Sequence, residues 1–162
     1  MRTLGVAAIL AAMSLPAFSA DLSPGDLRAL LAEGDAATVV HGLDPISWET
    51  FLAHVSAGDR GWIDVVPLLQ PGADAAIEQS LATALSRALS ANPVGVLTLL
   101  SGDSFTVADI CGTSHVEGPP AVAAQFIDAA LVKVAAVTDP QLSQTRNACL
   151  HALGEARIAA LI

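Results

Sequence analysis

The chain has 162 residues, of which 53% are hydrophobic, and its formal net charge at pH 7 is −9. Only seven Lys and Arg stand against 16 Asp and Glu, which excludes the basic surface that nucleic acids and anionic lipids select. An acidic surface is compatible with a basic protein partner, but it also keeps a protein soluble without any specific partner.

The N-terminus has the three-part pattern of a secretory signal peptide over residues 1–20. A positive start is followed by the uncharged apolar run Leu4–Leu15 and then by small residues. This run is shorter than the roughly 20 apolar residues that span a membrane, and no cysteine follows it to carry a lipid. We therefore predict cleavage after Ser19 or Ala20, export to the periplasm or the extracellular space, and one helical domain over residues 21–162 without stable membrane insertion.

A capping side chain directly before a proline indicates the start of a helix. The capping side chain accepts hydrogen bonds from the free backbone N–H groups of the first turn, and proline at the first helical position has no N–H group that would stay unpaired. This pairing occurs at Ser23-Pro24, Asp44-Pro45, Asn92-Pro93 and Asp139-Pro140. Together with the apolar periodicity it predicts helices over 24–33, 36–41, 45–57, 60–70, 74–91, 93–100, 106–111, 120–138 and 140–160. Alternating strand patterns are scarce, so we predict an all-α fold, a compact bundle of about eight antiparallel helices.

One internal repeat lies within the predicted helices 45–57 and 60–70. The pattern W-x-x-Φ-Φ-x-x-Φ-x-x-G, where Φ is apolar, begins at Trp48 and again at Trp62. Its spacing places both tryptophans on the buried face of a helix that ends at glycine, and the two copies predict a helical hairpin. The hairpin resembles HEAT-like helical repeats in architecture, although two copies are fewer than a stable array needs. Pro67 should kink or shorten the second helix.

Two cysteines, Cys111 and Cys149, follow the predicted signal peptide. Two cysteines in an exported chain most often form a disulfide, and Cys149 lies on the apolar face of the last predicted helix. We therefore expect a disulfide between them rather than a reactive thiol.

No local catalytic motif is present: the sequence lacks H-E-x-x-H, G-x-S-x-G and the phosphate-binding G-x-x-x-x-G-K. The four histidines do not show metal-ligand spacing, and we expect no metal or other cofactor. The loop after Cys111 holds Ser114, His115 and Glu117, with Asp103 nearby in sequence. These four residues are the candidate binding site, because loops carry function more often than cores do.

Three functions remain open. The first is a non-enzymatic protein-binding module, in its sharpest form an inhibitor or immunity protein that neutralises a secreted toxin. It rests on export, on the expected disulfide and on the nine acidic residues between Asp21 and Asp74, which could mask a basic active site. The alternatives are an enzyme with its site in region 103–117 and a carrier of a small apolar ligand between helices.

Overall fold

The computed structural model describes residues 22–112 and 119–160, which are mostly helical and contain no strand. The predicted signal peptide lies outside this part of the chain. None of the described helices is long and apolar enough to cross a membrane. The elements in chain order are α1 (Pro24–Glu33), α2 (Ala36–Gly42), α3 (Pro45–Ser56), α4 (Arg60–Ile63), α5 (Val66–Leu69), η1 (Gln70–Gly72), α6 (Ala75–Ala88), α7 (Pro93–Leu100), α8 (Val107–Cys111), α9 (Pro120–Ala135), η3 (Pro140–Leu142) and α10 (Ser143–Ala159).

Three of the four cap–proline pairs start α-helices as predicted, whereas the fourth, Asp139-Pro140, starts the short turn η3, and α10 begins three residues later at Ser143. Ser23 and Asp26 form a capping box at the start of α1. The Asp44 carboxylate accepts hydrogen bonds from two backbone N–H groups of α3, and the Asn92 side chain accepts one from Gly95 in α7. The all-α prediction is therefore confirmed, and local hydrogen bonds at the helix starts explain why these boundaries can be read from the sequence.

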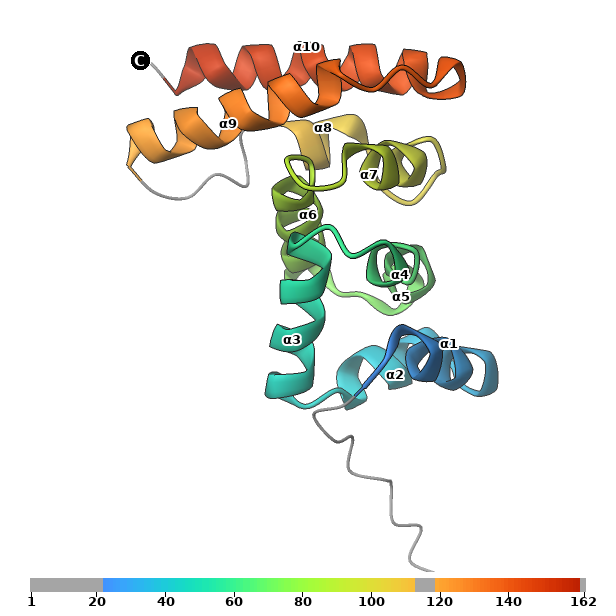
Figure 1. Ribbon diagram of the computed structural model, residues 1–162. Coiled ribbons are helices and arrows are strands. Elements are labelled where there is room, and N and C mark those ends of the chain that lie inside the picture. Colours follow the sequence, from blue (N-terminus) through green and yellow to red (C-terminus); the bar gives the residue numbers. More distant parts are fainter. Residues whose placement is uncertain (1–21, 113–118, 161–162) are drawn as a thin grey trace, which may run out of the picture.

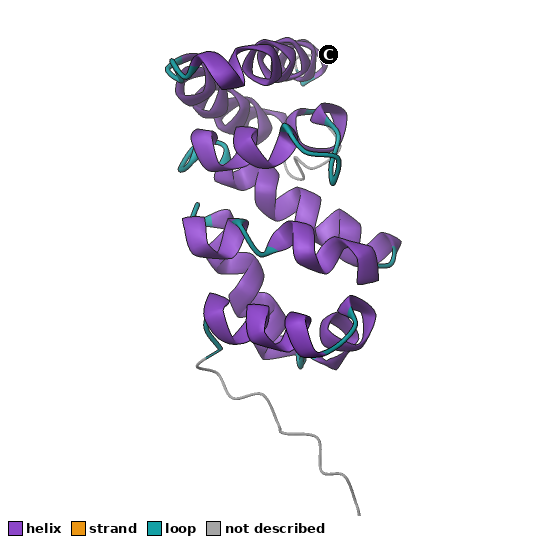
Figure 2. Cartoon of the chain, turned by 90° about the vertical axis from the view of Figure 1, so that its right-hand side faces the viewer, coloured by secondary structure: helices purple, strands orange, loops and turns teal. Residues whose placement is uncertain are grey.

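The helices are stacked in layers (Figures 1 and 2). Helices α1 and α2 form one end of the stack, and α9 and α10 lie side by side across the other end. Between these ends, α3 and α6 pack against each other, while α4 contacts α7 and α8 contacts both α6 and α10. Neighbouring layers thus share one continuous apolar core.

The core draws its largest side chains from the middle of the chain. On α6, Leu81 and Leu85 are fully buried, as is Leu89 directly after it, and their spacing of four residues places them on one apolar stripe. Further fully buried side chains come from the helices on either side: Leu27, Phe51, Ile63, Leu69, Leu97, Ile110 and Ile127.

The sequence repeat does not become two equivalent helices. The first copy forms α3, which is followed by Gly58 at a φ of +84°, a left-handed conformation that favours glycine. For the second copy the sequence predicts one helix over 60–70 that Pro67 kinks or shortens. The interruption is present, but the single helix is wrong: α4 ends at Ile63, and α5 begins at Val66. Pro67 explains the break, because its ring would collide with the carbonyl four residues earlier, that of Ile63.

The tryptophans of the repeat pack as expected for core residues. Trp62 is buried and meets the ring of Phe51 edge-on, with the ring centroids 5.6 Å apart. Trp48 is partly buried and stacks on the ring of Phe51, with the two ring centroids 5.4 Å apart.

The predicted disulfide is present and joins α8 to α10. Cys111 and Cys149 are both fully buried, their Cα atoms are 5.3 Å apart, and the bond spans 38 positions of sequence. The bond anchors α8, which has only one full turn, to α10, the longest helix of the described chain.

Candidate functional site

The residues selected from the sequence are only partly placed. Ser114, His115 and Glu117 lie outside the described residues. Asp103 is an exposed residue in the turn between α7 and α8. A binding site built from these four residues therefore stays a prediction.

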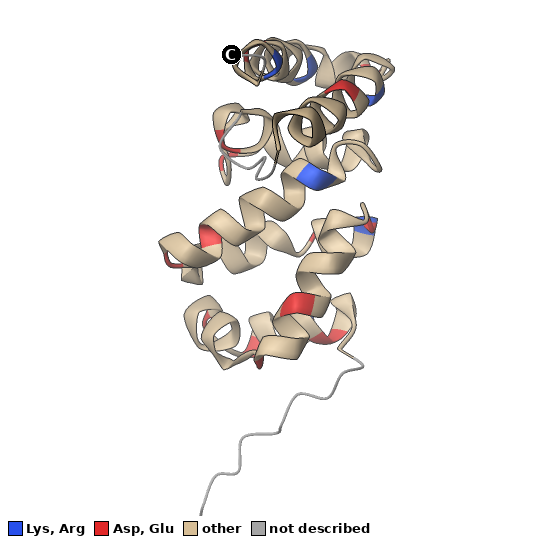
Figure 3. Ribbon diagram, turned by 90° about the vertical axis from the view of Figure 1, so that its left-hand side faces the viewer, with Lys and Arg blue, Asp and Glu red and all other residues tan. Residues whose placement is uncertain are grey.

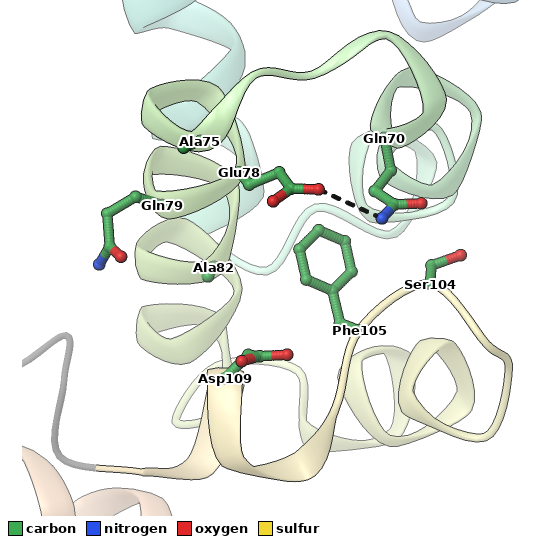
Figure 4. A pocket seen from close by; sticks show the side chains of 8 residues that line it. All are labelled: Gln70, Ala75, Glu78, Gln79, Ala82, Ser104, Phe105 and Asp109. Carbon is green, nitrogen blue, oxygen red and sulfur yellow. Dashed lines mark hydrogen bonds between the residues drawn. The ribbon is translucent and has the colours of Figure 1, made fainter.

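A cleft opens beside that turn, between the first half of α6, η1 and the segment that leads into α8 (Figure 4). Its volume is about 290 Å³. The residues that line it are Gln70, Ala75, Glu78, Gln79, Ala82, Ser104, Phe105 and Asp109. Three of them, Ser104, Phe105 and Asp109, belong to the region 103–117 in which the sequence predicts a site.

Glu78 supplies a carboxylate from the α6 wall of the cleft. It lies in the first turn of α6, after Asp74 has capped the helix by accepting from the N–H groups of Ala76 and Ile77. One Glu78 oxygen faces the side-chain amide of Gln70 on η1 across a long hydrogen bond of 3.5 Å (Figure 4). Because that bond is at the limit of hydrogen-bonding distance, it leaves most of the charge on Glu78 available to a ligand.

Asp109 supplies the second carboxylate, from the α8 wall. It occupies the third position of a capping box, in which its Oδ2 accepts from the backbone N–H of Thr106 at 2.9 Å and from the Thr106 hydroxyl at 2.7 Å. These bonds fix the direction of the carboxylate while its other oxygen takes no part in the box. The Asp109 wall is therefore pre-organised by the start of α8.

Phe105 places an aromatic ring between the two walls (Figure 4). The residue is 8% exposed, so its ring contributes to the core on one side and to the cleft on the other. No Lys, Arg or His is among the described residues that line the cleft. Two carboxylates and an aromatic face form a site suited to a cation.

Among the described residues, the cleft shows no nucleophile paired with a base. Nucleophilic catalysis needs a hydroxyl or thiol within hydrogen-bond reach of a base, and Ser104 has no histidine beside it in the described lining. The described residues likewise contain no cluster of three or more His, Cys, Asp or Glu side chains that could hold a metal ion.

A second polar cluster lies at the end of α3. The Nδ1 atom of His54 is 2.6 Å from Oδ2 of Asp59, and the His54 ring stacks on Trp62 with centroids 5.1 Å apart. The side-chain amide of Asn92, just before α7, also stabilises the turn after α3, because it donates a hydrogen bond to the carbonyl of Gly58 at 2.8 Å. These contacts lock the connection between α3 and α4, and they explain the cluster without a ligand.

Several of the acidic residues cap helices. Asp35, Asp44, Asp74 and Asp139 each accept backbone N–H bonds at a helix start. A hydrogen bond from a neighbouring Ser or Thr hydroxyl lowers the pKa of Asp35 and Asp44, and of Asp26 in the first turn of α1. Acidic residues are spread over the layers from α1 to α6 and recur on α8, α9 and α10, and α10 also carries two arginines (Figure 3).

Sequence reasoning missed Gln70, Glu78 and Phe105. The T-x-x-D pattern at Thr106 signals a helix start, and it would have drawn attention to Asp109 but not to a cleft. Gln70 and Glu78 meet Phe105 only through the packing of η1 and α6 against the segment before α8, which has no local signature.

In comparisons with protein-family models, curated proteins and solved structures, the chain matches none of them. No family is shown, so the geometry of the cleft is the basis for assigning a function.

Proposed function

We propose that this protein is an exported protein-binding module whose cleft between α6 and α8 receives a basic side chain of its partner. The observation that carries the proposal is the pair of carboxylates on opposite walls, Glu78 and Asp109, with the Phe105 ring between them and no cation among the described lining residues.

The size of the cleft favours a side chain over a free metabolite. Pockets for drug-sized ligands enclose about 300–1,000 Å³, so about 290 Å³ lies at the lower limit. A carrier of an apolar ligand needs an apolar cavity, whereas this cleft has Gln70, Glu78 and Asp109 in its lining. A guanidinium or ammonium group would gain charge-assisted hydrogen bonds from the carboxylates and a cation–π contact from the ring.

In its sharpest form, the module is an inhibitor or immunity protein that covers the active site of a basic secreted toxin. Three features support this version. The leader pattern predicts release outside the cytoplasm, the disulfide between Cys111 and Cys149 suits an oxidising compartment, and the acidic layers from α1 to α6 would speed the encounter with a basic partner.

A titration followed by two-dimensional NMR of backbone amides tests the cleft directly. We expect N-acetyl-arginine amide to shift the amide signals of α6 and α8 with a Kd in the millimolar range, as is usual for a fragment. N-acetyl-citrulline amide has almost the same shape without the charge, and we expect it to leave those signals in place.

Two variants make the assay specific. Glu78→Gln removes one cleft carboxylate, and we expect it to abolish the arginine-dependent shifts. Glu49→Gln makes the same change on the exposed face of α3, away from the cleft, and should preserve them. Equal shifts with both ligands, or shifts that survive Glu78→Gln, would refute a cation site.

A capture experiment tests the inhibitor version. The protein, immobilised at low salt, is exposed to secreted and periplasmic extracts of its host, with the Glu78→Gln variant as the matched bait. We expect a basic protein that binds the first bait, is reduced on the second and is released by salt. The absence of any such protein would count against the inhibitor version and leave the arginine titration to decide on the cleft.

A further inference from the structure

The outer face of α9 is unusual for a surface helix. Its inner face is buried against the core through Ile127, Ala130 and Val134. Its outer face should then be polar, because a helix that is apolar all round is normally covered on every side. Instead, five exposed residues form a row, which we call the α9 seam: Val122, Gln125, Ala129 and Val132 on the outer face and Ala136 directly after the helix.

The seam follows the spacing of a coiled coil. Its steps of three, four, three and four residues place Val122 and Ala129 at the a positions and Gln125 and Val132 at the d positions of two successive heptads, and Ala136 at the next a position. Both valines are well exposed, Val122 at 55% and Val132 at 69%. The alanines leave room for the backbone of another helix to approach closely.

Two charges flank the seam in the positions that select a partner helix. Asp128 is at a g position, and Lys133 is at the e position five residues later. In a parallel pair of helices, a g residue of one helix faces the e residue of the next heptad on the other. Two copies of α9 would therefore place Asp128 opposite Lys133 on both sides of the seam.

The Asp128 carboxylate is already oriented for such a contact. Its Oδ1 accepts a hydrogen bond from Nε of Arg157 on α10 at 2.7 Å, which leaves Oδ2 for a second cation. At its C-terminal end the seam meets a shallow groove of about 460 Å³, which Ala136 lines together with Pro93 and Val94. Val94 is itself 41% exposed, so the apolar surface continues beyond the helix.

We propose that α9 pairs in parallel with the α9 helix of a second copy of this chain about a twofold axis. The seam is self-complementary, as a twofold interface must be, because one stripe carries both the apolar centre and both signs of charge. The fold has already formed the helix, so pairing does not bear the cost of helix nucleation that limits short isolated coiled coils.

Light scattering coupled to size-exclusion chromatography tests the pairing. The protein is purified from the periplasmic fraction of an expression host, so that its leader is processed as in the cell, and is measured from micromolar to millimolar concentration. We expect a mass that rises towards twice that of one chain. A single-chain mass over the whole range would overturn the proposal.

Two matched variants locate the interface. Val132→Glu puts a charge at a d position of the seam, and we expect it to abolish the rise in mass. Ile158→Glu makes the same kind of change at a residue that is 63% exposed on α10 and outside the seam, and it should dimerise like the unaltered protein. Circular dichroism checks that both variants fold. Dimers that survive Val132→Glu would overturn the proposal.

A charge exchange tests the orientation. Asp128→Lys gives a chain with two positive flanks, and Lys133→Asp gives one with two negative flanks. We expect each variant alone to stay monomeric and the equimolar mixture to form heterodimers, because opposite charges then face each other at both g–e contacts. A mixture that stays monomeric would refute the parallel seam.

Discussion

The bond between Cys111 and Cys149 should be a main determinant of stability. In the chain-entropy treatment, a crosslink stabilises a protein by restricting the unfolded chain, and the effect grows with the logarithm of the loop length. For a separation of 38 residues, this treatment gives about 4 kcal/mol at 25 °C. That is a large part of the roughly 5–15 kcal/mol by which domains of this size are stable.

Replacement of both cysteines by alanine tests this value in urea unfolding followed by circular dichroism. With a slope of about 2 kcal/mol per molar urea, a loss of about 4 kcal/mol moves the midpoint down by about 2 M. Reduction of the unaltered protein is the control, because it opens the crosslink while both buried sulfur atoms stay in the core. The difference between the two losses measures packing alone.

The replacement of both cysteines should also weaken ligand binding in the cleft. Asp109 lies two residues before Cys111 on α8, so the disulfide holds the wall that carries the second carboxylate. We expect arginine-dependent NMR shifts to weaken in the double variant under conditions where it remains folded.

In the urea experiment, a midpoint shift below about 0.5 M would mean that the loop is already restricted in the unfolded chain, and the entropic reasoning would be refuted.

Two further predictions concern the helix ends. Gly58→Ala should lower the free energy of unfolding by about 2–4 kcal/mol, because φ at this position is +84° and the new Cβ would lie 2.9 Å from the Cβ of Ala91. Gly42→Ala is the control: a Cβ at this position would have nothing within 4 Å, so the variant should be neutral or stabilising in the same urea assay. Acid should destabilise the protein through Asp44, because the hydrogen bond from Ser47 lowers the pKa of the Asp44 carboxyl in the folded state. The stability that the ionised carboxyl contributes is fully present above its pKa in the unfolded chain. This stability is lost as the pH falls through the lower pKa of the folded state. Urea midpoints measured from pH 7 to pH 3 should fall below about pH 4, and less steeply in Asp44→Ser, which keeps a capping oxygen without a titrating group; equal slopes would contradict this account.

The sequence is most informative where a structural outcome depends on neighbours in the chain. Helix α1 begins at Pro24 because the capping box of Ser23 and Asp26 needs only four consecutive residues, and the predicted boundaries of this helix are those observed. The disulfide is also within reach of prediction, since a chain with two cysteines allows a single intramolecular pairing.

The errors have two sources, one local and one in tertiary packing. Apolar spacing after Trp62 suggests one helix, but the steric effect of Pro67 is stronger than the period and divides the segment into α4 and α5. The cleft could not be predicted, because Glu78 and Phe105 are 27 positions apart in sequence and meet only when α6 packs beside the segment before α8. Periodicity identifies the inner face of a helix, but it does not identify which side chains share the space between two helices.

The layered arrangement also has a kinetic consequence. The most extensive contacts between helices join elements at most a few places apart in the chain, such as α3 with α6 and α9 with α10, so each layer can form once those elements are available. In the exported chain that we propose, translocation with the N-terminus first would allow the early layers to form before Cys149 reaches the same compartment. Oxidation of the cysteine pair would then come last and would seal a nearly complete molecule, so the time taken to form the disulfide, rather than a search among folds, would set the pace of maturation.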